Sequence, residues 1–223
     1  MKRILVLVEG QTEEHFVKEL LVPNFSYAPY KIYFYPTIIT TKTVKNKPDF
    51  KGGINSYEKV KSNLLKLFND TSAKIITTMI DYYKLPTDFP GYKDMPNADF
   101  YGKVSYLEEK FKEDINNTRF VPYIQVHEFE AYLFSSSEGF NKVFLNKNKN
   151  KELEKVNNII NQFNNPEAIN EGSETAPSKR LSHIFKEYKK TLHGISIAKH
   201  LGLETIRKSC SHFNNWLKIL ESI

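Results

Sequence analysis

Residues 3–18 read RILVLVEGQTEEHFVK. The five apolar residues at 4–8 have the length of a buried strand, and the run stops at Glu9 and Gly10. Thr12 then offers a cap for a helix whose apolar positions include Phe16 and Leu20. This stretch therefore predicts a core strand that turns directly into a helix, with a carboxylate at the corner.

Two glutamates lie at this corner. Glu9 ends the predicted strand, and Glu13 is in the first turn of the predicted helix. Open α/β sheets bind their ligands at such corners, and a pair of carboxylates suits a hard divalent cation, Mg²⁺ or Mn²⁺, which prefers oxygen ligands and keeps several waters. The alternative is structural: an exposed glutamate followed by acidic residues that favour the positive end of a helix dipole.

The composition restricts the class of protein. The chain has 223 residues, enough for one large α/β domain or for one domain with a helical appendage. Cys210 is its only cysteine, which excludes an internal disulfide and a multi-cysteine zinc site. The N-terminal apolar run is too short for a signal peptide, and no apolar stretch approaches the roughly 20 residues of a membrane span. We therefore expect a cytoplasmic protein without a membrane partner.

The formal net charge of +6 is unevenly distributed. Residues 81–140 carry more acidic than basic side chains, whereas residues 1–80 and 141–223 are basic. An acidic centre between basic flanks suits a metal site whose margins attract a polyanion such as DNA or RNA. The alternative is that lysines on solvent-exposed helix faces account for the charge.

Strands and helices alternate through the first part of the chain. Apolar and β-branched runs predict strands at 31–35, 74–80 and 120–126, the last of which is interrupted by Pro122. Helical periodicity predicts helices at 56–68 and 104–114. Residues 40–53 are predicted to form a loop or hairpin. This alternation is typical of an α/β fold with a mostly parallel sheet flanked by helices.

The last third of the chain has no run of residues that indicates a strand. It predicts helices alone, at residues 153–163, 178–189, 195–201 and 203–220. We therefore predict two domains, an α/β core at residues 1–140 and a helical C-terminal extension at 141–223 that packs on the core.

Three predicted strands end in acidic residues. Glu9 follows the first strand, Asp81 follows the strand at 74–80, and Glu128 and Glu130 come soon after the last. Parallel neighbouring strands bring such groups to one edge of a sheet, and metal-dependent phosphoryl transfer needs several carboxylates around one or two divalent ions. The candidate metal ligands are Glu9, Glu13, Asp81, Glu128 and Glu130, and the first candidates for a catalytic role are Glu9, Asp81 and Glu128.

Lys179 and Arg180 open a predicted helix directly after Pro177. Backbone amides at a helix N-terminus together with two cations make a natural contact for phosphate, and a lysine near metal ions stabilises charge on a scissile phosphate. We therefore predict that both residues bind nucleic acid and that Lys179 is catalytic. The alternative is that Ser178 is a plain cap and that both cations are solvated.

Six motifs occur in order along the chain. They are VEGQTE at 8–13, MIDYY at 79–83, DFPG at 88–91, HEFEA at 127–131, NPEAIN at 165–170 and PSKR at 177–180. With these motifs the chain resembles the DUF4276 family from its first strand to its last helix. That family looks like a divergent branch of the Toprim superfamily, so the resemblance implies a Toprim-like α/β fold. It also implies Mg²⁺-dependent chemistry, as in topoisomerases, primases and overcoming-lysogenization-defect nucleases.

The resemblance assigns roles to two of the acids. Glu9 matches the Toprim glutamate, and Asp81 matches the first aspartate of the later Asp-x-Asp motif. Tyr83 stands where the second aspartate would be. One of the other candidate acids, Glu13 or the pair after the third strand, then has to supply the missing ligand.

The resemblance also implies a partner, because members of the family resemble accessory nucleases encoded beside an ABC-type or AAA-type ATPase in bacterial anti-phage systems. The chain has no phosphate-binding loop of the P-loop type of its own. We therefore expect a Mg²⁺-dependent nuclease that acts on DNA or RNA with an ATPase partner, and a homo-oligomer is compatible with the sequence. The alternatives are a catalytically silent Toprim-like module that binds nucleic acid or the ATPase as a scaffold or sensor, and a small-molecule phosphohydrolase that uses the same carboxylates.

Overall fold

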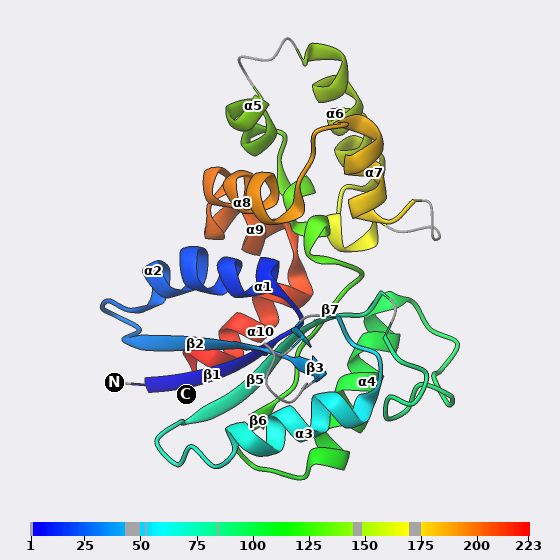
Figure 1. Ribbon diagram of the computed structural model, residues 1–223. Coiled ribbons are helices and arrows are strands. Elements are labelled where there is room, and N and C mark those ends of the chain that lie inside the picture. Colours follow the sequence, from blue (N-terminus) through cyan, green and yellow to red (C-terminus); the bar gives the residue numbers. More distant parts are fainter. Residues whose placement is uncertain (1, 43–49, 52, 84, 145–148, 170–174) are drawn as a thin grey trace. The chain divides into compact units, whose positions relative to one another are not determined.

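The computed structural model describes residues 2–42, 50–51, 53–83, 85–144, 149–169 and 175–223. Its contacts divide the chain into two compact units, Met1–Gln125 with Ile223 and Val126–Ser222 (Figure 1). The predicted division at residue 140 lies further along the chain. The difference arises because the segment Phe129–Ser135 is buried among helices of the second unit, so that unit begins earlier.

A parallel sheet forms the centre of the first unit. Its strands are β1 (Lys2–Val8), β2 (Ile32–Ile38), β5 (Ile75–Asp81), β6 (Phe120–Val121) and β7 (Ile124–Gln125). The spatial order is β2-β1-β5-β6, and β7 also pairs with β5. Every pair in this sheet is parallel. This confirms the predicted α/β class, and Pro122 interrupts the last strand as the sequence indicates.

Helices cover both faces of this sheet. The first helical stretch consists of α1 (Gln11–Phe16), η1 (Val17–Leu21) and α2 (Val22–Phe25), and it lies on one face. The helices α3 (Tyr57–Leu67) and α4 (Phe100–Ile115) lie on the other face (Figure 1). The change of face follows from topology. The chain moves from β1 outward to β2, then returns past β1 to β5 and continues to β6. The first crossover and the later ones therefore run in opposite directions along the sheet. Because each is right-handed, their helices lie on opposite faces.

The first helix begins earlier than its sequence predicts. Its N-cap is Gly10 in an extended conformation, and no side chain caps it, so Thr12 lies inside the helix instead of capping it. The apolar positions Phe16 and Leu20 are buried, as predicted. At Gly10 a Cβ atom would lie 3.3 Å from Glu13 Oε2, so the Glu13 carboxylate lies close to the start of the helix.

The loop after β5 is tied to the helices beside it. The backbone N–H of Tyr57 donates to both carboxylate oxygens of Asp88, at 3.0 and 3.1 Å, so the loop aspartate caps α3. The predicted hairpin contains the antiparallel strands β3 (Thr40–Lys42) and β4 (Phe50–Lys51). Residues 43–49 and 52 of this hairpin, residue 84 of the loop and residue 170 of the NPEAIN motif lie outside the described residues.

The second unit is helical, which confirms the predicted helical C-terminal part. Its elements are η2 (Phe129–Ser135), α5 (Glu138–Phe144), α6 (Asn150–Phe163), η4 (Pro166–Ala168), α7 (Pro177–Ile184), η5 (Lys190–Gly194), α8 (Ile195–Leu201), α9 (Leu203–Ser209) and α10 (Ser211–Glu221). Among the residues that the structure describes, no helix has both the length and the apolar character needed to cross a membrane.

Two of the predicted helices are shorter in the structure than the sequence indicates. The helix predicted at 178–189 ends at Ile184, because Phe185 is buried with an extended backbone. The helix predicted at 203–220 is two helices, and the break is at Cys210, which is fully buried with φ −115° and ψ 93°. The apolar spacing continues through Cys210 and therefore does not reveal the break.

Glu167 caps the helix that follows this break. Its carboxylate accepts the backbone N–H groups of His212 and Phe213, each at 3.0 Å, and only 1% of the residue is exposed. Asn165 caps η4 by accepting the N–H of Glu167 at 2.9 Å. The first N–H groups of a helix have no carbonyl partner within the helix, and a carboxylate that accepts hydrogen bonds from two of them supplies the missing acceptors. The NPEA part of the NPEAIN motif thus has a structural role.

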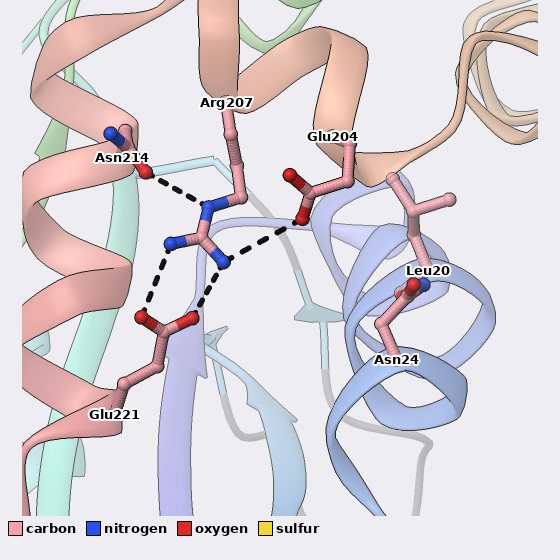
Figure 2. Close-up of polar contacts among 6 residues, drawn as sticks. All are labelled: Leu20, Asn24, Glu204, Arg207, Asn214 and Glu221. Atoms are coloured by element: carbon pink, nitrogen blue, oxygen red, sulfur yellow. Dashed lines mark hydrogen bonds and ion pairs between the residues drawn. The ribbon is translucent and has the colours of Figure 1, made fainter. Parts of the chain in front are cut away.

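Arg207 holds α9 and α10 together (Figure 2). Its Nη1 and Nη2 atoms donate to the two carboxylate oxygens of Glu221 at 2.5 and 3.1 Å, and its Nε donates to Asn214 Oδ1 at 2.8 Å. Glu204 is 3.8 Å away and its side chain is 74% exposed. The forked contact with Glu221 is the stronger interaction, because two parallel charge-assisted bonds fix both side chains.

Replacing Glu167 by Gln tests the cap on α10. The amide of glutamine offers one acceptor and one donor where the structure presents two N–H donors, so one backbone N–H loses its partner. We expect the free energy of unfolding to fall by about 1–3 kcal/mol in urea denaturation. The control Glu204→Gln changes an exposed ion-pair partner and should cost less than about 0.5 kcal/mol. Equal effects of the two substitutions would contradict this role of Glu167.

Candidate functional site

Glu9 and Asp81 meet at the C-terminal edge of the parallel sheet. The N–H of Glu9 donates to the carbonyl of Met79 at 3.2 Å, which extends the pairing of β1 with β5 by one residue. The Glu9 carboxylate then accepts the backbone N–H of Asp81 at 3.2 Å. Asp81 ends β5 opposite Gln125 and is only 8% exposed. The structure thus brings together the two acids that the sequence places at successive strand ends.

Glu13 is the third acid of this edge. It is in the first turn of α1 and is 3% exposed. A Cβ atom at Gly10 would lie 3.3 Å from Glu13 Oε2, so this carboxylate lies against the backbone of the residue after Glu9. Glu13 is therefore not a solvated glutamate that only interacts with the helix dipole, which was the structural alternative that the sequence left open. We name Glu9, Glu13 and Asp81 the carboxylate edge.

The carboxylate edge lies at the point where the strand order reverses. β1 leads outward to β2 and β5 leads outward to β6, so the connections diverge from the boundary between β1 and β5. Open α/β sheets bind ligands outside the carboxyl ends of the strands at such a point. Within the described parts of the chain, no group of three His, Cys, Asp or Glu side chains is arranged to hold a metal ion.

Glu128 caps a helix of the second unit. Its carboxylate accepts the backbone N–H of Ser178 and the Ser178 hydroxyl, both at 3.0 Å. Ser178 follows Pro177 at the start of α7, so an internal carboxylate lies where the sequence predicts a phosphate. Ser178 itself is not the cap. The predicted roles of Glu128 in metal binding and catalysis stay predictions.

Glu130 is a fully buried acid that lies next to a lysine. Its Oε2 is 3.1 Å from Lys190 Nζ. Burial is the main cause that raises the pKa of Glu130 to about 7; the charge of Lys190 acts against this shift and the nearby charge of Glu128 adds to it. Its predicted role as a metal ligand stays a prediction.

Tyr188 completes this cluster in the second unit. Its hydroxyl is buried and has no hydrogen-bond partner among the residues that the structure describes. Burial and the charges of Glu130 and Glu128 raise its pKa well above the usual range. A Cβ atom at Gly194 would lie 2.9 Å from this hydroxyl, so a larger residue there would displace the Tyr188 side chain. Sequence reasoning missed Tyr188 and Lys190, because nothing in their neighbourhood marks the buried glutamates that they approach.

His127 is fully buried and has a left-handed backbone, with φ 67°. Burial lowers its pKa to about 4, so its imidazole is neutral at pH 7. A non-glycine residue with positive φ is uncommon and is retained where the surrounding structure determines it. The HEFEA motif thus places a neutral histidine beside two buried glutamates in sequence.

Lys179 and Arg180 have different surroundings although they are adjacent in sequence. Lys179 is exposed on α7. Arg180 donates from Nε to the carbonyl of Thr175 at 2.7 Å, and its guanidinium lies 5.2 Å from the ring centroid of Phe163. These contacts orient Arg180 along the side of α7. Binding of nucleic acid by either residue, and catalysis by Lys179, stay predictions.

Residues 8–221 match the family described as "Domain of unknown function (DUF4276)". This chain belongs to the DUF4276 family. The match includes the carboxylate edge and the polar cluster of the second unit, and it confirms the resemblance that the six motifs indicate. Comparison with curated proteins and with solved structures found no match.

The pKa values of Glu130 and His127 predict opposite dependences of stability on pH in this DUF4276 protein. The raised pKa of Glu130 gives a contribution to stability that is complete below pH 4.5 and is lost as the pH rises through about 7. The lowered pKa of His127 gives a contribution that is complete above pH 6.5 and is lost as the pH falls through about 4. The two slopes oppose each other between pH 4.5 and 6.5.

Single substitutions should separate these slopes. In Glu130→Gln the free energy of unfolding should rise with pH between 4.5 and 6.5, by up to about 1.4 kcal/mol per pH unit, relative to the parent. His127→Asn, which tolerates the left-handed backbone, should show the opposite slope. Urea denaturation at several pH values measures both. Parallel stability curves for the parent and the two variants would show that neither group titrates as described.

Proposed function

We propose that this DUF4276 protein is a Mg²⁺- or Mn²⁺-dependent nuclease with a Toprim-like site, the effector of an ATPase-coupled anti-phage system. One observation carries the proposal: the Glu9 carboxylate meets the backbone of Asp81 at the point where the strand order reverses. That position is where an open α/β sheet binds its ligand, and both side chains are hard oxygen donors.

The donor set fits a hard divalent cation. Glu9 and Asp81 offer carboxylate oxygens from adjacent strands, and Asp81 is almost fully buried. Buried carboxylates carry a large desolvation cost that a bound cation reduces. Mg²⁺ is bound in proteins by one or two carboxylates together with several waters, so a pair of acids on adjacent strands suffices. Softer ions that prefer sulfur or several imidazoles do not fit this set.

The chain's own residues supply orientation. The N–H of Asp81 holds the Glu9 carboxylate at the edge, and the close approach of Glu13 to Gly10 holds the third acid next to it. Glu9 and Asp81 would hold a divalent ion at this edge, and the ion would supply Lewis-acid chemistry toward a phosphate ester and its attacking water. Because both strands are buried and paired, the two carboxylates keep their separation while substrate enters.

Replacing Glu9 by Gln tests the metal site. The amide keeps the shape and can still accept the N–H of Asp81, but it removes one negative charge from the edge. We expect Mn²⁺ affinity, measured by calorimetry, to fall by about tenfold or more while the unfolding transition changes little. The matched control is Glu109→Gln, an exposed glutamate on α4. Equal Mn²⁺ affinity in the parent and Glu9→Gln would overturn the proposed site.

A cleavage assay tests the proposed activity and its partner. The chain alone should cleave plasmid DNA or RNA weakly in Mg²⁺, and the product of a neighbouring ATPase gene should stimulate cleavage by shifting the population of the competent conformation. Glu9→Gln and Asp81→Asn should abolish the stimulated activity, whereas Glu109→Gln should retain it. Vigorous cleavage without the ATPase would contradict the coupling. Absence of cleavage with Mn²⁺, ATP and the ATPase together would contradict the nuclease.

The second candidate function is a catalytically silent module that binds nucleic acid or the ATPase. The observation that favours it is Tyr83, which occupies the position of the second aspartate in the resemblance to Toprim proteins. Substitution Tyr83→Asp separates the two functions. A gain in Mn²⁺ affinity without any cleavage would favour the silent module, and cleavage by the unsubstituted chain would exclude it.

A further inference from the structure

A groove between α6 and α7 of the second unit has the composition of an anion site. Its volume is about 380 Å³. The residues that line it are Lys155, Asn158, Ile159, Thr175, Arg180, His183 and Ile184. They comprise basic and polar side chains around two isoleucines, and none of the lining residues that the structure describes is acidic. The volume lies within the range of pockets that hold small organic ligands, about 300–1,000 Å³.

The same spacing of side chains occurs on both walls of the groove. On α6, Lys155 is followed by Asn158 and Ile159, at three and four residues. On α7, Arg180 is followed by His183 and Ile184 at the same intervals. Residues three and four apart share one helix face. Each helix therefore contributes one permanent cation, one nitrogen-bearing side chain and one isoleucine to the groove.

Two acidic residues near the groove helices, one on α6 and one after α7, share a lysine that does not line the groove. Glu154, directly before Lys155 in sequence, does not line the groove either. Glu152, one turn before Lys155, is 3.3 Å from Lys149 Nζ, and Glu187 is at the same distance from that lysine. Arg180 is oriented by its bond to Thr175 and by the ring of Phe163. A guanidinium with a fixed orientation loses little entropy when it binds a phosphate oxygen pair.

We propose that this groove binds a phosphate group carried by an apolar or aromatic moiety, as in a nucleotide, either free or within a strand. Lys155 and Arg180 contact the phosphate from opposite walls. The isoleucines Ile159 and Ile184 contact the base or sugar. The site is distinct from the carboxylate edge, which belongs to the other compact unit, and it does not depend on metal binding there. Lys179 does not line the groove.

Amide NMR of the full chain locates the site. Inorganic phosphate, a nucleoside monophosphate and a short single-stranded oligonucleotide are titrated separately. Saturable shifts centred on residues 155–159 and 180–184 with at least one of them support the proposal. Shifts with the monophosphate indicate a free nucleotide, and shifts with the oligonucleotide alone indicate a strand. Saturable shifts centred elsewhere, or no saturable shift with any of the three, would overturn it.

Charge substitutions then test the recognition. Lys155→Glu is at an exposed position on α6 and should weaken binding of the monophosphate or oligonucleotide by about tenfold or more. Arg180→Lys keeps the charge but loses the fork and should also weaken binding. The matched control Lys208→Glu, exposed on α9, should stay within about twofold. If Lys155→Glu and Lys208→Glu lose the same affinity, the loss is due to the net charge of the protein and not to a contact in the groove, and the site is overturned.

One more variant separates this inference from the nuclease proposal. Glu9→Gln removes a charge from the carboxylate edge and should leave binding in the groove unchanged. Loss of Mn²⁺ binding with intact nucleotide binding would support both sites. Intact Mn²⁺ binding with intact nucleotide binding would overturn the metal site and leave the groove standing. Loss of nucleotide binding in Glu9→Gln would contradict the independence of the groove.

Discussion

Parallel pairing of β1 with a strand on each side is the constraint on which the candidate site depends. β1 is hydrogen-bonded along its length to β2 and to β5, and its apolar residues are buried. A strand held on both edges cannot shift its register without moving its apolar set out of the core. The residue that follows the last buried position is therefore fixed, and that residue is Glu9. The same register places Asp81 beside it.

Three buried carboxylates of the second unit have backbone amides or a cation that compensate for the loss of water. Glu128 caps α7, Glu167 caps α10 and Glu130 is paired with Lys190. Each of these contacts replaces hydration with fixed charge-assisted bonds. A buried acid is therefore not by itself evidence of a catalytic role in this chain. Glu9 and Asp81 differ from the caps because they follow strands of the parallel sheet and meet where the strand order reverses.

The sequence predicted the architecture of the first unit because its signals are local. The apolar run of β1, the spacing of Phe16 and Leu20, and the Thr- and Ile-rich run of β5 each report the face that a segment buries. Parallel pairing followed from the alternation of strands and helices. The position of Asp81 beside Glu9 could be predicted for this reason, since each is the acid at the C-terminal end of a buried parallel strand.

The sequence by itself determined which residues end the strands, which segments are helical and that the chain belongs to the DUF4276 family. Only the tertiary structure decided what each acid contacts. Whether Glu128 meets a metal or an amide, and whether Glu130 meets Lys190 or Tyr188, depends on residues far apart in the chain. The break at Cys210 is likewise tertiary, because the apolar spacing is continuous there and the cap comes from Glu167. Local periodicity reports burial, whereas partners are set by packing between distant segments.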